Sequence, residues 1–121
     1  MNIVEQNTSS VLELCKLHHV KNMCLFGSIL TQKFSSDSDV DILVNFEHVD
    51  LFQYFDNYME LKEKLEHLFG RPVDLLEEQT VNNPVLKRSI NRNKKMIYPY
   101  ILRTVSAKLQ RNEFLANTYN D

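Results

Sequence analysis

Glycine and proline are scarce in this chain, and tryptophan is missing. Its 121 residues include two glycines, three prolines and no tryptophan. A chain so poor in glycine and proline contains no flexible glycine- and serine-rich linker, and it shows no internal repeat. The length suits one domain. We therefore expect a single folded unit in which each glycine marks a position of interest.

Cysteine and long apolar runs are equally scarce. The two cysteines, Cys15 and Cys24, match no metal-binding or redox spacing, and Cys24 lies in an apolar run typical of a core. No stretch approaches the roughly 20 apolar residues that a membrane-spanning helix needs. Residues 1–10 are polar and lack the apolar stretch of a signal peptide. We expect a reduced, cytoplasmic protein with no membrane partner.

No charge dominates the chain. It has 14 basic and 16 acidic residues, a net charge of −2 and a pI of about 6.1. This balance argues against a protein held on nucleic acid chiefly by its overall charge. A local basic segment remains, which is either a solvated helix face or a contact surface for RNA or an acidic partner. It contains Lys87, Arg88, Arg92, Lys94 and Lys95.

Hydrophobic spacing predicts alternating helices and strands. The clearest helix spans 51–69, where apolar residues recur every three or four positions and Gly70 follows as a stop signal. Asn83-Pro84 has the form of a helix start. We predict helices over 9–19, 28–34, 51–69 and 84–96, and strands over 23–26, 39–46 and 72–76. This order predicts the α/β class, with a small mixed β-sheet and helices packed on one face.

The chain divides near residue 98. Residues 1–98 carry the predicted alternation and form the expected domain. Residues 99–121 form a C-terminal tail in which Ile101, Val105 and Leu109 recur at helical spacing. The tail could be an additional helix, a partner-binding extension or partly disordered, and the sequence leaves these alternatives open.

The residues that could carry chemistry begin at Gly27. Glycine permits a tight turn and a close backbone approach, and Ser28 would open a short helix whose N–H groups favour a phosphate. Asp39 and Asp41 are two residues apart on a predicted strand, so both carboxylates lie on one face, about 6–7 Å apart at the backbone. Carboxylates beside a phosphate cradle suit Mg²⁺.

Asp74 extends this acidic group. It lies on the predicted strand after the long helix, which would pair with the strand of Asp39 and Asp41 through a crossover connection. Val73 and Leu75 point to the opposite face, so Asp74 can join the other two aspartates. Three carboxylates on one face repel one another unless cations neutralise them.

Simpler interpretations exist for the same residues. Ser28 could be only a helix cap, and the aspartates could be a solvated strand start. A calcium loop is a further alternative, but position 42 is isoleucine where such a loop needs glycine, and position 48 is histidine where it needs glutamate. The ordered combination of Gly27, Ser28, Asp39, Asp41 and Asp74 favours a nucleotide-transfer site.

Together these motifs resemble the minimal nucleotidyltransferases of the DNA polymerase beta-like superfamily. That family combines Gly-Ser, a spacer, Asp-x-Asp and a later strand aspartate, which here are Gly27-Ser28, Asp39-Val40-Asp41 and Asp74. The resemblance covers the first helix to about residue 98. Where many members carry an arginine and a glycine after Gly-Ser, this chain has residues 29–32 as Ile-Leu-Thr-Gln, with Lys33 nearby as a substitute cation.

The resemblance implies an enzyme that transfers a nucleoside monophosphate to a hydroxyl of a protein or RNA. The expected group is AMP, taken from ATP. Asp39, Asp41 and Asp74 would hold two Mg²⁺ ions, with Mn²⁺ as an alternative, and Gly27, Ser28 and Lys33 would contact the nucleotide. Family members often act as antitoxins of HEPN-type toxins, which predicts such a partner. The other hypothesis is a catalytically weak module that neutralises a toxin by direct contact.

The sequence does not identify the acceptor, the preferred base or the oligomeric state. A chain this short has no separate substrate-recognition domain, so we expect a partner subunit or self-association to complete the acceptor site.

Overall fold

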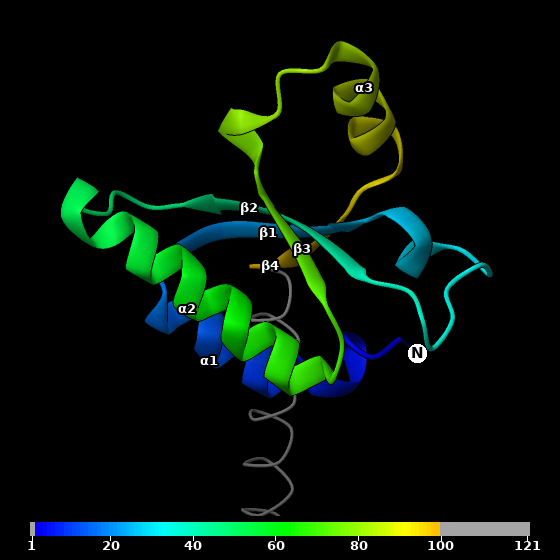
Figure 1. The fold of residues 1–121 in the computed structure, drawn as a ribbon, viewed down its shortest axis with the longest axis horizontal. Helices are drawn as coiled ribbons and strands as arrows, with labels where there is room; N and C mark the ends of the chain where they lie inside the picture. Colours follow the sequence, from blue (N-terminus) through cyan, green and yellow to red (C-terminus); the bar gives the residue numbers. More distant parts are fainter. Residues whose placement is uncertain (1, 100–121) are drawn as a thin grey trace, which may run out of the picture.

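The computed structural model describes residues 2–99, which form one four-stranded sheet with helices on both of its faces (Figure 1). No helix in this range is long and apolar enough to cross a membrane. The predicted tail lies outside the described residues apart from Pro99. In chain order the elements are η1 (Glu5–Asn7), α1 (Thr8–Leu17), β1 (Val20–Phe26), η2 (Gly27–Leu30), β2 (Val40–Phe46), α2 (Leu51–Phe69), β3 (Val73–Glu77), η3 (Glu78–Thr80), α3 (Pro84–Asn93) and β4 (Lys95–Tyr98).

The strands lie in the order β3-β2-β1-β4. β1 is antiparallel to both β2 and β4, whereas β2 and β3 are parallel. The connection between the parallel strands is α2, as parallel pairing requires a crossover. The predicted mixed sheet of the α/β class is therefore confirmed, as is the predicted pairing of the second and third strands. The helices were predicted on one face, but α3 packs on the face opposite to α1 and α2.

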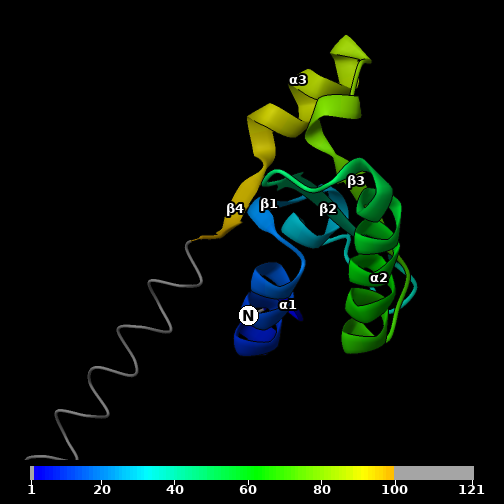
Figure 2. The same ribbon diagram turned by 90° about the vertical axis from the view of Figure 1, so that its left-hand side faces the viewer.

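One face of the sheet is covered by α1 and α2 (Figure 2). Val40, Ile42 and Val44 of β2 point toward these helices and are fully buried. Leu61 and Leu65 of α2 are equally inaccessible, because their spacing of four places them on one side of the helix. This layer holds the larger core cluster and supplies most of the apolar burial that stabilises the domain.

The opposite face carries a small cluster under α3. It consists of four buried residues, Cys24, Phe26, Leu43 and Ile90. Ile90 is the buried residue of α3, and its helix is held at its start by Asn83, whose side chain accepts hydrogen bonds from the backbone N–H groups of the first turn. The predicted start of this helix at Asn83-Pro84 is confirmed.

The long helix has the predicted bounds but a shorter buried stripe. Gly70 follows it in the left-handed conformation (φ 66°), as expected of a C-cap glycine. At the other end, Leu51 and Phe55 continue the apolar spacing of the helix, yet they are 83% and 68% exposed. The helix extends beyond the sheet there, so these two residues have no layer to pack against.

Three other sequence-based expectations are wrong in detail. The first helix begins at Thr8 with Asn7 before it, so the prediction of a start at Ser9 is one residue late. The short helix expected over 28–34 is only the single 3₁₀ turn η2. The last helix, expected to continue to residue 96, ends at Asn93, and the chain then forms β4 on the free edge of β1.

Candidate active site

The predicted catalytic aspartates lie at one end of the sheet. In the parallel pair, Asp41 of β2 stands directly beside Asp74 of β3. On the other side of β2, Asp41 pairs with Phe26, the last residue of β1. Asp39 directly precedes β2 and is exposed. The three aspartates and Gly27 therefore meet where β1 ends and β2 and β3 begin, on the sheet face that carries α3.

Gly27 lies in direct contact with one of these carboxylates. Its φ is +76°, which favours glycine over any residue with a side chain. A Cβ atom placed on Gly27 would come within 2.2 Å of Oδ2 of Asp41. The backbone of η2 and the Asp41 carboxylate thus occupy adjoining space, which a larger residue would disrupt. The expectation that this glycine serves a close approach agrees with the geometry.

The electrostatics of the site centre on Asp41. Partial burial raises the pKa of its carboxyl group, and the negative charges of Asp74 and Asp39 raise this pKa further. The ionised form of Asp41 is therefore less favourable than that of an isolated aspartate, and a nearby cation would offset this effect. The charges of Asp74 and Asp39 thus both act on Asp41.

These donors suit a hard divalent cation. Within residues 2–99, no group of three or more acidic, histidine or cysteine side chains is placed so that it could hold a metal ion. Mg²⁺ does not need one, because it commonly takes one or two carboxylates and completes its shell with water and substrate phosphate oxygens. Asp39, Asp41 and Asp74 offer oxygen ligands only, of the class that Mg²⁺ and Mn²⁺ share.

The predicted phosphate-contacting residues occupy different surroundings. Ser28 lies within η2, where its carbonyl accepts hydrogen bonds from the backbone and the hydroxyl of Thr31. Because η2 is a single 3₁₀ turn, it lacks the dipole of the longer helix that the sequence predicted. Lys33 is exposed in the following loop. Gly27, the first residue of η2, lies directly against the carboxylate of Asp41.

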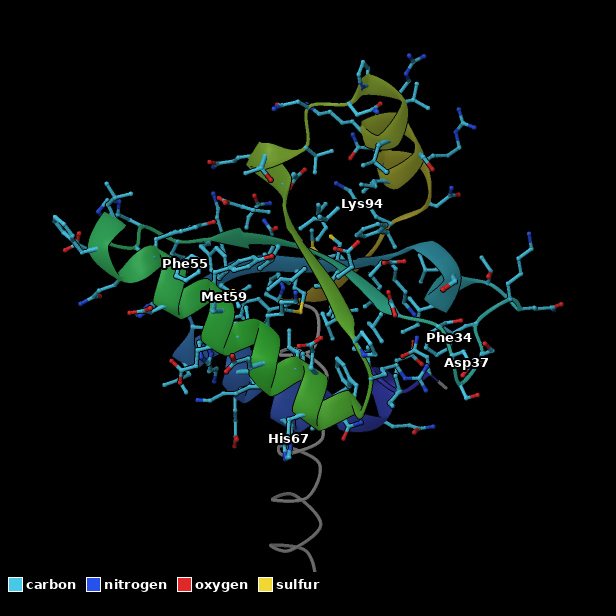
Figure 3. All side chains as sticks on the ribbon, viewed as in Figure 1. Phe34, Asp37, Phe55, Met59, His67 and Lys94 are labelled. Atoms are coloured by element: carbon cyan, nitrogen blue, oxygen red, sulfur yellow. The ribbon has the colours of Figure 1, made fainter. Side chains whose placement is uncertain are left out.

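Arg71 orders the loop that leads to Asp39, a role that the sequence analysis missed. Its guanidinium donates hydrogen bonds to the carbonyl groups of Ser35 and Ser38 at 3.0 and 3.3 Å. It also lies 4.6 Å from the centre of the Phe34 ring. Phe34 and Asp37 mark this loop in Figure 3. Nothing in the sequence distinguishes Arg71 from a residue that merely follows the Gly70 cap.

A cavity of about 440 Å³ adjoins Gly27. One wall comes from η2 and the end of β1, and the other is the face of α3 that looks toward them. Its volume lies in the range of small-molecule sites. The α3 wall was not predicted, because its residues recur at helical spacing but are too polar to indicate a buried face. The lining residues are Phe26, Gly27, Leu30, Thr31, Leu86, Ser89, Ile90 and Asn93.

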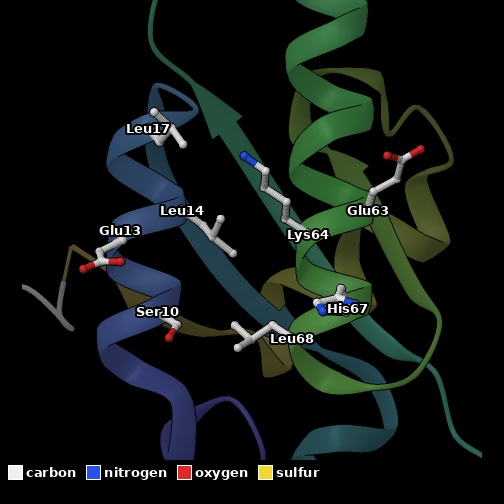
Figure 4. Close-up of a pocket in the computed structure, with 8 residues that line it drawn as sticks. All are labelled: Ser10, Glu13, Leu14, Leu17, Glu63, Lys64, His67 and Leu68. Atoms are coloured by element: carbon white, nitrogen blue, oxygen red, sulfur yellow. The ribbon is translucent and has the colours of Figure 1, made fainter.

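A second cavity of similar size, about 400 Å³, lies between α1 and α2 (Figure 4). It opens on the outer side of these helices, which cover the face of the sheet opposite to the aspartates. Leu14, Leu17 and Leu68 make it largely apolar, with Glu13 and His67 at its edge. None of the predicted catalytic residues lines it.

The basic segment near α3 is divided among different surroundings. Lys87, Arg88 and Arg92 are exposed. Lys94, at the end of α3 (Figure 3), lies 3.6 Å from Glu78, and Lys95 of β4 lies 2.8 Å from Glu5. Two of the five cations are thus paired with carboxylates, and the other three form a solvated surface of the helix.

Comparisons with known proteins agree with this geometry. The family model described as "Polymerase beta, Nucleotidyltransferase" matches residues 10–100. A Methanocaldococcus jannaschii protein, provisionally named protein adenylyltransferase MJ1379, is 37% identical over 76 residues, which span 63% of this chain and 75% of the relative. The residues matched by the family model include Asp39, Asp41 and Asp74.

Solved structures share the fold. A protein provisionally described as a minimal nucleotidyltransferase superposes with a TM-score of 0.64 at 30% identity, covering 78% of this chain and 95% of that one. A structure of a tri-AMPylated Shewanella oneidensis HEPN toxin in complex with an MNT antitoxin gives a TM-score of 0.54 at 19% identity, covering 95% and 98% of the two chains. At that lower identity the likeness concerns the fold alone.

Proposed function

The chain belongs to the polymerase beta nucleotidyltransferase family, and from that membership we propose that it transfers AMP from ATP to a hydroxyl group of a partner protein. The observation that carries this proposal is the meeting of Asp41, Asp74 and Gly27 at one end of the sheet. A relative named as a protein adenylyltransferase supports AMP as the group and protein as the acceptor.

Each residue of the site has a chemical task in this proposal. The acceptor oxygen attacks the α-phosphorus of ATP, a new O–P bond forms, and pyrophosphate leaves with the electrons of the bond that breaks. Gly27 lets the phosphates approach the backbone closely. Asp39 and Asp41 would hold the divalent ions, and Asp74 would complete the ligand set and accept the proton of the attacking hydroxyl. Bound Mg²⁺ would neutralise the charge that develops on the phosphate oxygens.

The partner is proposed to be a HEPN-type protein that this chain adenylylates as an antitoxin. This assignment is supported by the shared fold of the MNT antitoxin that was solved with a tri-AMPylated HEPN toxin. We place the reaction in the cytoplasm, where ATP is available and where the free thiols of Cys15 and Cys24 stay reduced.

The test compares ATP labelled at the α-phosphate with ATP labelled at the γ-phosphate. Purified protein, Mg²⁺ and a lysate of the source organism are incubated with each, and the products are treated with protease or ribonuclease. We expect protease-sensitive label from the α position only. Asp39→Asn should abolish this label, whereas Asp37→Asn should retain it, because Asp37 is an exposed residue of the same loop.

Contrary results have distinct meanings. Label that survives in Asp39→Asn would overturn the proposed site. Ribonuclease-sensitive label would replace the protein acceptor with RNA.

A contact-based antitoxin without catalysis is the second candidate. The observation in its favour is that residues 29–32 carry no cationic side chain and that Lys33 does not line the cavity beside Gly27. In that case the wild-type protein would transfer no label, and Asp39→Asn would still neutralise the partner. Loss of neutralisation in Asp39→Asn would exclude it.

A further inference from the structure

Asp39 differs from the other two aspartates in how it is held. Asp41 and Asp74 lie within β2 and β3 and stand beside each other in the parallel pair, whereas Asp39 precedes β2. It is exposed, and within residues 2–99 its carboxylate makes no hydrogen bond and no ion pair. The direction of this side chain is therefore set by the backbone on either side of it.

The two peptide groups that flank Asp39 are held by consecutive residues. The carbonyl group of Ser38 accepts a hydrogen bond from Nη1 of Arg71 at 3.3 Å, and the backbone N–H of Val40 donates to the carbonyl group of Pro72 at 3.0 Å. Because each peptide group is planar, holding both of them restricts φ and ψ of the residue between them. The segment that leads into β3 thus determines where the Asp39 side chain points.

Arg71 also closes the turn that precedes Asp39. The same Nη1 atom donates to the carbonyl group of Ser35 at 3.0 Å, so one nitrogen joins the two ends of the turn. The guanidinium forms no ion pair with any of the residues that the structure describes, and its Nε is buried without a hydrogen bond there. A buried N–H group without a partner opposes folding, so stability alone does not explain this arginine.

We propose that Arg71 is a positioning residue for metal binding, which acts by holding the Asp39 carboxylate in place beside Asp41. The inference rests on the proposed nucleotidyl transfer and concerns a residue that contacts neither the metal ion nor the nucleotide. Within residues 2–99 no group of three side chains is placed so that it could hold a metal ion, so the affinity depends on how well each carboxylate is ordered beforehand. A ligand group that is already ordered loses less conformational entropy on binding.

The positive charge of Arg71 and its hydrogen bonds have opposite effects on a cation. A positive charge near carboxylates repels Mg²⁺, so removal of the charge alone would strengthen metal binding. Loss of the hydrogen bonds releases Asp39 and would weaken metal binding. Arg71→Met removes both but keeps a long side chain against the Phe34 ring. The direction of the change in metal affinity therefore distinguishes the two effects.

The first measurement is Mn²⁺ binding to the full chain without nucleotide, followed by the loss of the free-ion signal in electron paramagnetic resonance. We expect Arg71→Met to bind Mn²⁺ about tenfold more weakly than the wild type, as when groups that orient metal ligands are removed. Arg71→Lys keeps a donor and the charge and should have an intermediate affinity. Lys16→Met removes an exposed positive charge from α1 and should bind as the wild type does.

The second measurement is amide hydrogen exchange, which reports on the ordering itself. Amides of residues 35–40 should exchange at least about tenfold faster in Arg71→Met, while those of α2 should keep their wild-type rates. Thermal unfolding identifies loss of fold in Arg71→Met, and Arg71→Lys then decides the question.

The third measurement is the dependence of transfer from α-labelled ATP on Mg²⁺ concentration. In Arg71→Met, the Mg²⁺ concentration that gives half the maximal rate should rise about tenfold, and the maximal rate should change by less than about threefold. A purely structural role would instead lower the maximal rate and leave the half-maximal Mg²⁺ concentration unchanged.

Three results would overturn the inference. The first is a Mn²⁺ affinity of Arg71→Met equal to or higher than that of the wild type. The second is unchanged exchange of the amides of residues 35–40. The third is a wild-type protein that binds Mn²⁺ no better than Asp39→Asn, which would exclude Asp39 as a ligand. The binding and exchange measurements contain neither ATP nor an acceptor, so failure of this inference and failure of the proposed reaction are separable.

Discussion

The two faces of the sheet differ in what they contribute, and β2 belongs to both. Val40, Ile42 and Val44 face α1 and α2 and are fully buried in the large core cluster. On the other side, Asp41 lies at the catalytic end and Leu43 packs in the small cluster beneath α3. Alternate residues of one strand thus serve stability and chemistry separately. This arrangement predicts that substitutions on the two faces have different, measurable consequences.

The largest effect on catalysis is expected from Asp41→Asn. Loss of a partner outside the metal ligands commonly costs about 10–100-fold, and a ligand itself should cost more. Stability should not fall. The pKa of Asp41 is raised by burial and by Asp74 and Asp39, so its ionised form opposes folding at neutral pH and a neutral amide removes that penalty. Initial rates with α-labelled ATP and urea unfolding at pH 7 measure both quantities.

A decrease in stability of Asp41→Asn would contradict the separation of the two faces. Asp56→Asn, at an exposed position of α2, is the control and should change neither quantity.

The next effect is expected from Gly27→Ala. Its added Cβ would overlap the Asp41 carboxylate, 2.2 Å away, and a displacement of that size in a reacting group can cost about 100-fold in rate. Gly70→Ala is the matched control, because Gly70 also has a positive φ of 66° but has nothing within 4 Å of its Cβ position. Both variants should lose about 1 kcal/mol of unfolding free energy from the backbone conformation.

Only Gly27→Ala should lose transfer, measured as the initial rate with α-labelled ATP. Equal rates in the two variants would show that the contact with Asp41 is irrelevant to catalysis.

On the face that contacts the helices, Leu65→Ala should reduce stability without reducing the rate per folded molecule. Leu65 is fully buried between α2 and the sheet, and a cavity at such a position costs about 2–5 kcal/mol. Urea unfolding measures the loss, and rates are compared well below the transition. Leu17→Ala, at a position that is 62% exposed, should change stability by less than about 0.5 kcal/mol.

The smallest effect concerns the edge of the sheet, where Lys95 of β4 contacts Glu5. The hydrogen bond from Lys95 lowers the pKa of Glu5 below its usual 4.5. A lowered pKa means that the contribution is present above the unfolded pKa and is lost as pH falls through the folded pKa. Lys95→Ala should therefore lose under about 1 kcal/mol at pH 7 and nothing near pH 2, in urea unfolding at both pH values.

The same loss at both pH values would point to packing of the lysine side chain as its source. Lys21→Ala, an exposed lysine of β1, controls for the change in net charge.

Local signals explain why part of this architecture was predictable. The prediction of α2 was correct at both ends because Gly70 stops a long periodic pattern. The alternation of apolar and polar residues in β2 predicted the correct face for Asp41. Because α2 was predicted to connect two strands, the position of Asp74 beside Asp41 followed from the pairing of β2 with β3.

The missed features depend on tertiary packing. β4 is four residues long and follows a basic helix with no glycine or proline between them, so its residues extended the helical pattern. The walls of the cavity depend on where α3 docks over Ile90, which no local pattern specifies. Arg71 donates hydrogen bonds to backbone carbonyl groups of a loop distant in sequence. Every residue has a backbone carbonyl group, so the residue types in the loop do not indicate this contact.

The register of β2 and β3 determines which face of the sheet each aspartate occupies, so an odd shift and an even shift along a strand have different effects. Val40 stands beside Val73 and Asp41 beside Asp74, and successive residues of a strand point to opposite faces. An insertion of one residue before Asp74 within β3 would turn that carboxylate into the apolar core, while an insertion of two would return it to its own side one step further along. Among members of this family, the loops between these strands should therefore vary freely in length. Within the strands, insertions or deletions of an odd number of residues should be rare.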